Sequence, residues 1–537
     1  MSYIADKYYR YDELVDLLHN WKDKHGDIFD YEVIGVSYEN RDIYAITISS
    51  NLNNHSKKPA YYIDANHHAG EVTGSAVALY TVNYLLNNQS DKQVRFLLDN
   101  YTFYIIPRIS VDGSEFFLTT PYSLRSSVRE YSQTLKKGLL QEDIDKDGRI
   151  LQMRFKSDLG SFKVSEKDPR LMVKREPDDI YGDFYEVVTE GLVEDYDGVE
   201  VKPFNTKWGL DFNRNYPIGW NPENIQKGAG PYPLSENETR AVANFVLSHD
   251  NIAGIMSYHT YGGVILRPYC TKPDKEIDKQ DLEFFKNIGV IGEDLTGYPC
   301  WSIFEKFTMD KDNPSAGSFI DFVYDNLGIT AFATELWDLR GRAGLKKITF
   351  LERLKQTNKE QEEDGLKLLE YNDEEFNGEL FVNWYKVQHP QLGEVELGGW
   401  VPKYSMQNPP EKHLEEECHK NMLFTLAHAA AMPRLDIQDV KVTDFKEGIY
   451  QVIATLVNKG FLCTSGSVLA SKQEKYKKIT VGINGECEVL SEKELVYENL
   501  NGFSKKKIEF IVKTNQDHIK LVAKSLRAGS IEKETKL

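Results

Sequence analysis

The chain has 537 residues, which is more than a single hydrophobic core usually supports, so its length predicts at least two domains. Hydrophobic residues make up 41% of it and charged residues 28%, and no apolar run approaches the roughly 18 residues of a membrane-spanning helix. The net charge of -18 at pH 7 argues against nucleic acid and anionic membranes as partners, because the summed field would repel both.

Residues 1–26 interleave charged with apolar side chains and lack the continuous apolar stretch of a secretory signal. The five cysteines are odd in number and show no CxxC spacing, which favours free thiols over a disulfide framework. Both features predict a cytoplasmic protein.

From about residue 31 to residue 104 the sequence alternates between strand and helix patterns. Strands are predicted at 32–36, 43–48, 60–65 and 101–106, and a helix after residue 71 places apolar side chains on one face. This alternation predicts an α/β fold, with a central mixed β-sheet flanked by helices.

Two later strands, 252–258 and 329–336, lead to polar residues with catalytic potential. The first runs into His259, and the second carries Glu335. In open α/β sheets, ligands bind beyond strand ends, where loops from different strands converge. Residues far apart in sequence are therefore expected to share one site.

The chain changes in character after about residue 350. Residues 352–379 are acidic with a helical pattern and are expected to form a solvated face. After residue 433, short runs of β-forming residues alternate with turn residues, which predicts an all-β sandwich. We therefore expect a catalytic domain at 1–432 and a small sandwich domain at 433–537, which serves in packing or interaction.

The segment HHAGE offers a metal site. His68 and Glu71 stand three residues apart where a strand gives way to a helix, so one imidazole and one carboxylate can share a Zn²⁺ ion. Catalytic zinc usually has three protein ligands and a water, and His259 is the best third ligand among the 12 histidines. His67, four residues from Glu71, leaves the choice of first histidine open.

Several ordered motifs resemble the zinc metallocarboxypeptidase family of the pancreatic carboxypeptidase A and B type, in a bacterial-like two-domain form. They are HAGE at 68–71, LDFNRNYP at 210–217, SYHTYGG at 257–263 and ITAFATELWD at 329–338. The resemblance covers roughly residues 8–430. It implies one zinc ion on His68, Glu71 and His259, with Glu335 as general base.

The same resemblance implies roles in substrate binding. Asn213 and Arg214 would hold the terminal carboxylate of a peptide, and Arg154, in ILQMR, would polarise the scissile carbonyl. Ile320 would form the floor of the terminal side-chain pocket, with Asp321 as the alternative if the register slips by one residue. The separation of Glu71 from His259 exceeds that of compact members and predicts an insertion at about 113–207.

Asp143, Asp145 and Asp147 alternate along a turn that ends in Gly148, as in the first half of a calcium loop. The twelfth position is Arg154 instead of the bidentate Glu. The segment therefore predicts either a Ca²⁺ site or an acidic turn.

Together these features predict a zinc-dependent carboxypeptidase acting on peptides with a free C-terminus. Two other functions stay open. One is a zinc amidohydrolase that deacylates small amino-acid derivatives, and the other is a catalytically silent peptide-binding protein. The presence of Glu335 argues against the silent protein.

Overall fold

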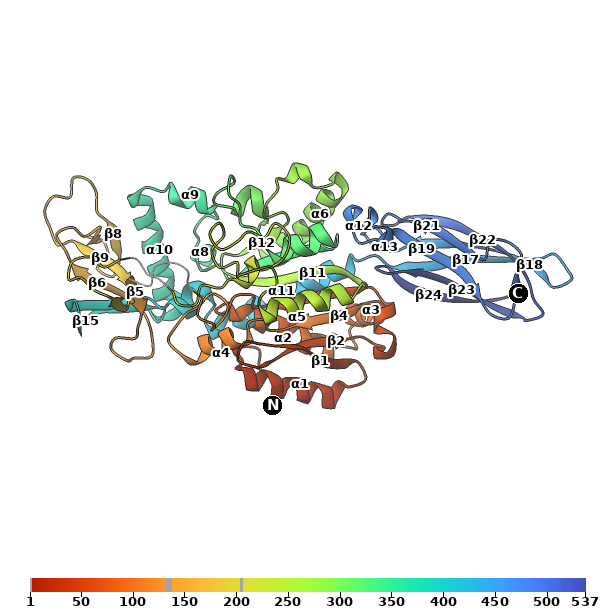
Figure 1. Cartoon of the computed structure of the whole chain (residues 1–537), viewed down its shortest axis with the longest axis horizontal. Coiled ribbons are helices and arrows are strands. Elements are labelled where there is room, and N and C mark those ends of the chain that lie inside the picture. The colour runs from red at the N-terminus through yellow and green to blue at the C-terminus, as the bar shows by residue number, and fades with distance from the viewer. Residues whose placement is uncertain (1, 132–137, 203–205) are drawn as a thin grey trace.

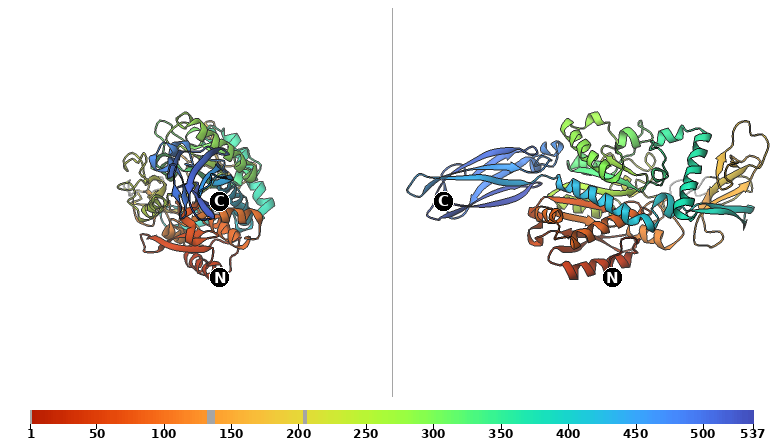
Figure 2. Two further views of the ribbon diagram at one scale, coloured as in Figure 1. Left: turned by 90° about the vertical axis from the view of Figure 1, so that its right-hand side faces the viewer. Right: turned by 180° about the vertical axis from the view of Figure 1, so that it is seen from behind.

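The computed structural model describes residues 2–131, 138–202 and 206–537. Residues 132–137 and 203–205 of the predicted insertion lie outside the described residues. The chain forms three parts in a row, with a central α/β body, an accessory β-sheet at one end and a β-sandwich at the other (Figure 1; Figure 2). No described helix is both long and apolar enough to cross a membrane.

The central body is built on an eight-stranded mixed sheet. β3 is parallel to β4 and β11, and β11 is parallel to β14. β2 is antiparallel to β1 and β4, and β12 is antiparallel to β14 but parallel to β13. The strand order is β1 (Phe29–Val36), β2 (Asp42–Ile48), β4 (Thr102–Ile106), β3 (Ala60–Ala65), β11 (Ile252–Thr260), β14 (Thr330–Leu336), β12 (Val264–Arg267) and β13 (Cys300–Ser302). The predicted α/β fold with a mixed central sheet is confirmed.

Burial on both faces explains why the central strands read as apolar runs. Every residue of β3 and β11 is buried, as expected for parallel strands covered by helices on both sides. One face packs against α1 (Tyr11–His25), α2 (Val72–Asn87), α3 (Lys92–Asn100), α6 (Lys279–Thr296) and α11 (Leu414–Ala430). The other face packs against α5 (Asn237–Ser248), α7 (Phe319–Asp321) and η5 (Phe322–Asn326).

Shorter helical elements fill the connections of the central body. They are η1 (Leu52–Lys57), α4 (Val111–Thr119), η2 (Phe212–Arg214), η3 (Asp274–Glu276), η4 (Ile303–Phe307), α8 (Leu339–Arg342), α9 (Phe350–Leu354), η6 (Pro402–Gln407) and η7 (Glu411–His413). The carboxyl ends of the parallel strands β3, β11 and β14 lie on the same side of the central body. The loop after β3 and the polar ends of β11 and β14 therefore meet there.

The accessory sheet combines two segments that are distant in sequence. Its six strands are β15 (Phe381–His389), β16 (Gly393–Trp400), β6 (Gln152–Lys156), β9 (Tyr185–Thr189), β7 (Phe162–Val164) and β8 (Met172–Lys174), with the pair β5 (Gly138–Gln141) and β10 (Gly191–Glu194) beside them. The predicted insertion thus supplies only part of a sheet that residues 381–400 complete.

The acidic stretch at 352–379 forms most of α9 and all of α10 (Asn358–Phe376). α10 is more than a solvated face, because Leu368, Leu369 and Phe376 are buried. Its acids also reach the accessory sheet, where Asp373 pairs with Arg170 at 2.7 Å.

The C-terminal part is the predicted β-sandwich. Its two four-stranded sheets are β17 (Leu435–Asp444), β18 (Ile449–Asn458), β22 (Lys505–Lys513) and β20 (Glu488–Val489), and β21 (Glu494–Glu498), β19 (Lys478–Asn484), β23 (His518–Ser525) and β24 (Gly529–Lys536). Two short helices, α12 (Val468–Ser471) and α13 (Glu474–Lys477), face the central body. Alternating buried residues such as Val452, Ala454 and Leu456 form its core.

A buried arginine joins the sandwich to the central body. The Arg527 guanidinium donates to the carbonyls of Leu327 at 2.7 Å, Gly328 at 3.2 Å and Ser465 at 3.1 Å. It also lies 3.8 Å from the centre of the Tyr476 ring. Because no carboxylate pairs with it directly among the described residues, carbonyl oxygens and the ring compensate for its buried charge.

We expect Arg527→Met to lower the thermal midpoint of the sandwich by several degrees. The substitution leaves buried carbonyls without donors, at a cost of about 2 to 3 kcal/mol. Calorimetry of the full chain measures the shift, with the exposed Lys533→Met as the matched control. An unchanged midpoint in Arg527→Met would show that the junction does not depend on this side chain.

Candidate active site

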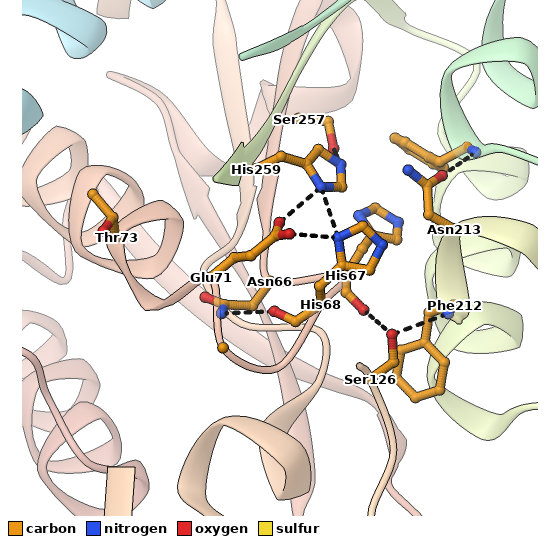
Figure 3. Close-up of polar contacts among 12 residues, drawn as sticks. Asn66, His67, His68, Glu71, Thr73, Ser126, Phe212, Asn213, Ser257 and His259 are labelled. Carbon is orange, nitrogen blue, oxygen red and sulfur yellow. Dashed lines mark hydrogen bonds and ion pairs between the residues drawn. The ribbon is translucent and has the colours of Figure 1, made fainter. Parts of the chain in front are cut away.

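The three predicted metal ligands lie together at the carboxyl ends of β3 and β11. Glu71 Oε1 lies 2.8 Å from His68 Nδ1, and Glu71 Oε2 lies 3.0 Å from His259 Nδ1 (Figure 3). The two imidazole Nδ1 atoms are 3.2 Å apart. All three residues are buried, so their donor atoms form one compact cluster inside the protein.

The donor set fits zinc. Two imidazoles and one carboxylate are a ligand combination of catalytic zinc, which leaves a position for water. Burial raises the pKa of Glu71, but the adjacent imidazoles outweigh it and hold that pKa well below its usual range. The cluster therefore offers an ionised carboxylate to a divalent cation.

Asp211 and Arg125 support the first histidine. Asp211 Oδ1 accepts a hydrogen bond from His68 Nε2 at 3.1 Å, which orients the ring so that Nδ1 faces the cluster. Arg125 Nε donates to Asp211 Oδ2 at 2.9 Å, and its Nη1 lies 3.5 Å from Glu71 Oε1. Both residues were missed in the sequence, although Asp211 stands two positions before Asn213 in the same motif.

His67 lies outside the cluster that His68, Glu71 and His259 form. Its Nε2 contacts the Tyr216 hydroxyl at 2.9 Å, and its ring stacks on that of His259. Burial and the neighbouring imidazoles keep the pKa of His67 well below its usual range. His67 therefore packs behind the ligands as a neutral ring.

Glu335 lies beside His259 on the adjacent strand. The two residues are direct partners in the parallel pairing of β11 with β14, so their side chains point to the same face of two strands that lie about 4.8 Å apart. Burial and the charge of Glu71 raise the pKa of Glu335 to about 7, although His259, Arg125 and Arg214 oppose the shift. Such a carboxyl group can exchange protons near neutral pH.

Asn213 and Arg214 lie on η2, directly after Asp211. Asn213 Oδ1 accepts from the Phe319 backbone N–H at 2.8 Å, which fixes the amide. The Arg214 guanidinium donates to the Asn213 carbonyl at 2.7 Å, and no ion pair engages it in the part of the chain that the structure describes. Arg214 is only partly buried, so its donors are available to an anionic ligand.

Ile320 and Asp321 lie on α7, which follows the loop that Asn213 holds. Ile320 is buried in an apolar cluster. Asp321 accepts hydrogen bonds from the Cys270 N–H at 2.9 Å and the Thr271 hydroxyl at 3.1 Å. Both carboxylate oxygens of Asp321 are therefore occupied within the protein.

The expected role of Arg154 requires a correction. Arg154 lies on β6 of the accessory sheet, and its Nε donates to Glu396 at 2.8 Å. The guanidinium also lies over the Trp384 ring, 4.4 Å from its centre. These partners hold Arg154 within the accessory sheet, and Arg125 stands beside Glu71 instead.

The acidic turn holds Asp143, Asp145 and Asp147 with their oxygens within 4.8 Å of one another. Its own donors already engage them. The Asp147 and Gly148 N–H groups donate to Asp143, and the Tyr385 hydroxyl donates to Asp145 at 2.5 Å. Calcium binding stays a prediction that no further contact of this turn supports.

Comparison with known proteins settles the family. Residues 14–364, well over half of the chain, match the family described as zinc carboxypeptidase. The chain belongs to this family. Residues 434–536 match a separate family described only as a domain of unknown function, which corresponds to the β-sandwich.

Among curated members of the zinc carboxypeptidase family, carboxypeptidase O of Bos taurus is 23% identical, and the match covers 52% of this chain and 58% of the relative. Mast cell carboxypeptidase A of Rattus norvegicus is 35% identical, over 26% of this chain and 35% of the relative. The chain thus spans 58% of the length of carboxypeptidase O and 35% of the length of mast cell carboxypeptidase A. The solved structure of thrombin activatable fibrinolysis inhibitor aligns over 79% of this chain and 74% of its own, at 18% identity and a TM-score of 0.45.

We expect Asp211→Asn to weaken zinc binding about 10- to 100-fold, because the substitution removes the charge that orients His68 and turns an amide toward Arg125. Zinc titration against a competing chelator measures the change. Asp373→Asn, which breaks an ion pair on the accessory sheet, serves as the control. Equal zinc affinity in all three proteins would contradict a supporting role for Asp211.

Proposed function

We propose that this protein is a zinc-dependent carboxypeptidase that hydrolyses the C-terminal peptide bond of peptides. The observation that carries the proposal is the convergence of His68, Glu71 and His259, with Glu335 in register beside His259. Metal-assisted hydrolysis requires a metal site and a nearby general base that can exchange a proton near neutral pH.

Zinc held by these three ligands would polarise the scissile carbonyl and lower the pKa of water. Glu335 is placed to take a proton from the attacking water and to return it to the leaving amine. The raised pKa of Glu335 suits both steps, because the group must accept and release a proton within one turnover.

Arg125 takes the role that the sequence assigned to Arg154. Its guanidinium is partly exposed at the cleft, while Asp211 and Glu71 fix its orientation. A positive charge beside the metal ligands can stabilise the negative charge that develops on the carbonyl oxygen, an effect worth about 3 kcal/mol.

Arg214 and Asn213 are proposed to bind the terminal carboxylate of the substrate. Arg214 combines a fixed backbone with a guanidinium that no ion pair engages in the described ranges. A guanidinium binds a carboxylate through two parallel hydrogen bonds, which distinguishes a chain end from an internal peptide bond.

An apolar terminal side chain is the proposed preference. Ile320 is buried among apolar neighbours, and Asp321 already accepts two hydrogen bonds, so Asp321 is poorly placed to pair with a basic side chain. This arrangement favours Phe or Leu over Lys or Arg as the released residue.

A reducing, cytoplasmic location stays part of the proposal. All five cysteines are free thiols, and Cys270, Cys418 and Cys463 are buried. Burial raises the pKa of each of these three thiols, which keeps them protonated and unreactive.

We expect Glu335→Gln to keep its zinc and to lose at least 100-fold in kcat, because the substitution removes the base without touching a ligand. Zinc content and peptide hydrolysis are measured together, with the exposed Glu394→Gln as the control. Near-normal kcat in Glu335→Gln would place the base elsewhere.

The same carboxyl group predicts the pH dependence. Its pKa is raised from 4.5 toward about 7, so the ionised base is lost as pH falls through that window, and kcat/KM should fall with it. The bound cation would move the midpoint toward the lower end. An acid limb outside this window would contradict the assignment of Glu335 as the base.

We expect amidation of a substrate's C-terminus and the Arg214→Ala substitution each to lower kcat/KM about 10- to 100-fold, because both remove the charge-assisted pair. The two changes should not add, since they remove the same interaction. Arg154→Met is the control and should leave the ratio of acid to amide unchanged. Equal hydrolysis of acid and amide by the unaltered protein would rule out recognition of the chain end.

A further inference from the structure

A cavity of about 570 Å³ lies between the central body and the accessory sheet. The described residues that line it come from α4 and the loop after it, from β5, β6 and β9, and from the start of η6. None of them is a proposed metal ligand, general base or substrate-binding residue. Cavities of this size are typical of binding sites for small molecules.

Lys403, on η6, brings a positive charge to this cavity. Its Nζ donates to the carbonyls of Phe117 at 2.5 Å and Thr120 at 2.6 Å, and both of these residues also line the cavity. The same Nζ lies 4.2 Å from the centre of the Phe117 ring. No carboxylate pairs with Lys403 in the described ranges. Burial lowers the pKa of Lys403 to about 7, because these partners do not replace the solvation of an ammonium group.

Capping of α4 does not by itself account for this lysine. α4 ends at Thr119, and a lysine near a helix C-terminus does stabilise the last carbonyls. Lysines in that role usually keep the ammonium group in water. Lys403 is half-buried at a cavity instead, where an anion that enters the cavity would stabilise its charge.

Two neutral side chains of the lining have donors that the protein does not use. Gln141 Oε1 accepts from the Ser123 N–H at 3.0 Å, which fixes the orientation of the amide. Neither Gln141 Nε2 nor the Ser123 hydroxyl donates to another described residue. Both donors are therefore available to an acceptor in the cavity.

The charge balance of the lining favours a single negative charge on the ligand. Arg149, the other cation among the described lining residues, already pairs with Asp147 at 2.5 Å. No acid is present in that described lining. One uncompensated lysine therefore remains, which suits a monoanion better than a dianion such as phosphate.

The rest of the wall is largely apolar. It includes Leu118, Pro121, Ile150, Leu151 and Val401. Apolar walls around one charged position suit a ligand with an apolar body and one acidic group. A free amino acid suits the cavity less well, because no acid in the described lining would pair with its ammonium group.

We propose that this cavity binds a monocarboxylate with an apolar body, of the class of medium-chain fatty acids and arylalkanoic acids. The carboxylate accepts hydrogen bonds from Lys403 and from Ser123 or Gln141, and the body packs against the apolar wall. The inference does not depend on the proposed carboxypeptidase function, because none of these residues takes part in hydrolysis.

Protection of Lys403 from reductive methylation tests the inference in the unaltered, zinc-loaded chain. A lysine with a lowered pKa reacts readily near neutral pH, and mass spectrometry of a digest measures the fraction methylated. We expect saturating octanoate or 4-phenylbutyrate to lower that fraction at Lys403 at least fivefold. Octan-1-ol lacks the charge and inorganic phosphate lacks the apolar body, so both should have little effect. Lys513, exposed on β22, is the internal control and should react equally throughout.

Calorimetry with octanoate separates this cavity from the metal site, which also binds carboxylates if the proposed function is correct. We expect two binding events in the unaltered chain, of which Lys403→Met removes one and Arg214→Ala weakens the other. Leu118→Trp, which fills the cavity and keeps the lysine, should weaken the same event as Lys403→Met at least tenfold. The comparison of octanoate with 4-phenylbutyrate shows whether an aliphatic or an aromatic body binds more tightly.

Several outcomes would overturn the inference. Equal methylation of Lys403 with and without both acids would show that neither binds there, and no methylation of Lys403 at all would show that the amine cannot be reached from the cavity. Equal protection by phosphate would exclude a role for the apolar body, and unchanged octanoate binding in Lys403→Met would exclude the lysine. None of these results bears on peptide hydrolysis, whose loss would instead contradict the proposed function.

Discussion

The site depends on keeping the Glu71 carboxylate buried and ionised. Removing a carboxylate from water is costly unless positive charges and donors compensate for it. Here each oxygen faces a different imidazole, and Arg125 adds a third partner. The compensation comes from three separate parts of the chain, so the charge is stable only when the loop after β3, the end of β11 and the Arg125 segment are all in place.

The loop that carries Glu71 is accordingly held by one residue of its own segment and by residues distant in sequence. Asn66 Nδ2 donates to the His68 carbonyl at 3.2 Å, and the Arg125 carbonyl accepts from the Ala69 N–H at 2.8 Å. Asn408, in the segment after β16, donates from its Nδ2 to the Gly70 carbonyl at 2.8 Å. The accessory sheet is linked to these contacts, because the chain enters it after Arg125, leaves it before Asp211 and leaves its last strand toward Asn408. The strands of the accessory sheet thus separate Arg125, Asp211 and Asn408 in sequence, although all three contact the loop at residues 68–71.

The β-sandwich contacts the central body at the ends of the parallel strands opposite to those that carry the metal ligands. Arg527 binds carbonyls of Leu327 and Gly328, which precede β14, whereas Glu335 lies near the end of that strand. Asp281, on α6, accepts from the Val468 and Leu469 N–H groups at the start of α12. The contacts of the sandwich are thus separated from the metal ligands by the length of a strand, which suits a packing or interaction module.

The sequence by itself predicted the strands of the sheet and the candidate metal ligands, with the choice between His67 and His68 left open. Apolar runs mark β3, β11 and β14 because both faces of these strands are buried, and His68, Glu71, His259 and Glu335 follow or end such runs. The β-sandwich was equally visible, since its strands alternate and turn residues separate them. The strands depend on neighbouring residues along the chain, so the spacing of apolar residues is enough to predict them.

Only the tertiary structure decided which arginine reaches the site. Arg154 and Arg125 both lie between the first and the last metal ligand in sequence, and no local pattern tells whether a guanidinium faces Glu396 in an accessory sheet or Glu71 in the cleft. Gln407, in the segment after β16, likewise lies beside Gly70 only because that segment folds back onto the loop after β3. Long-range contacts of this kind depend on how distant segments pack, because the side-chain period within one strand or helix fixes only the face on which a residue lies.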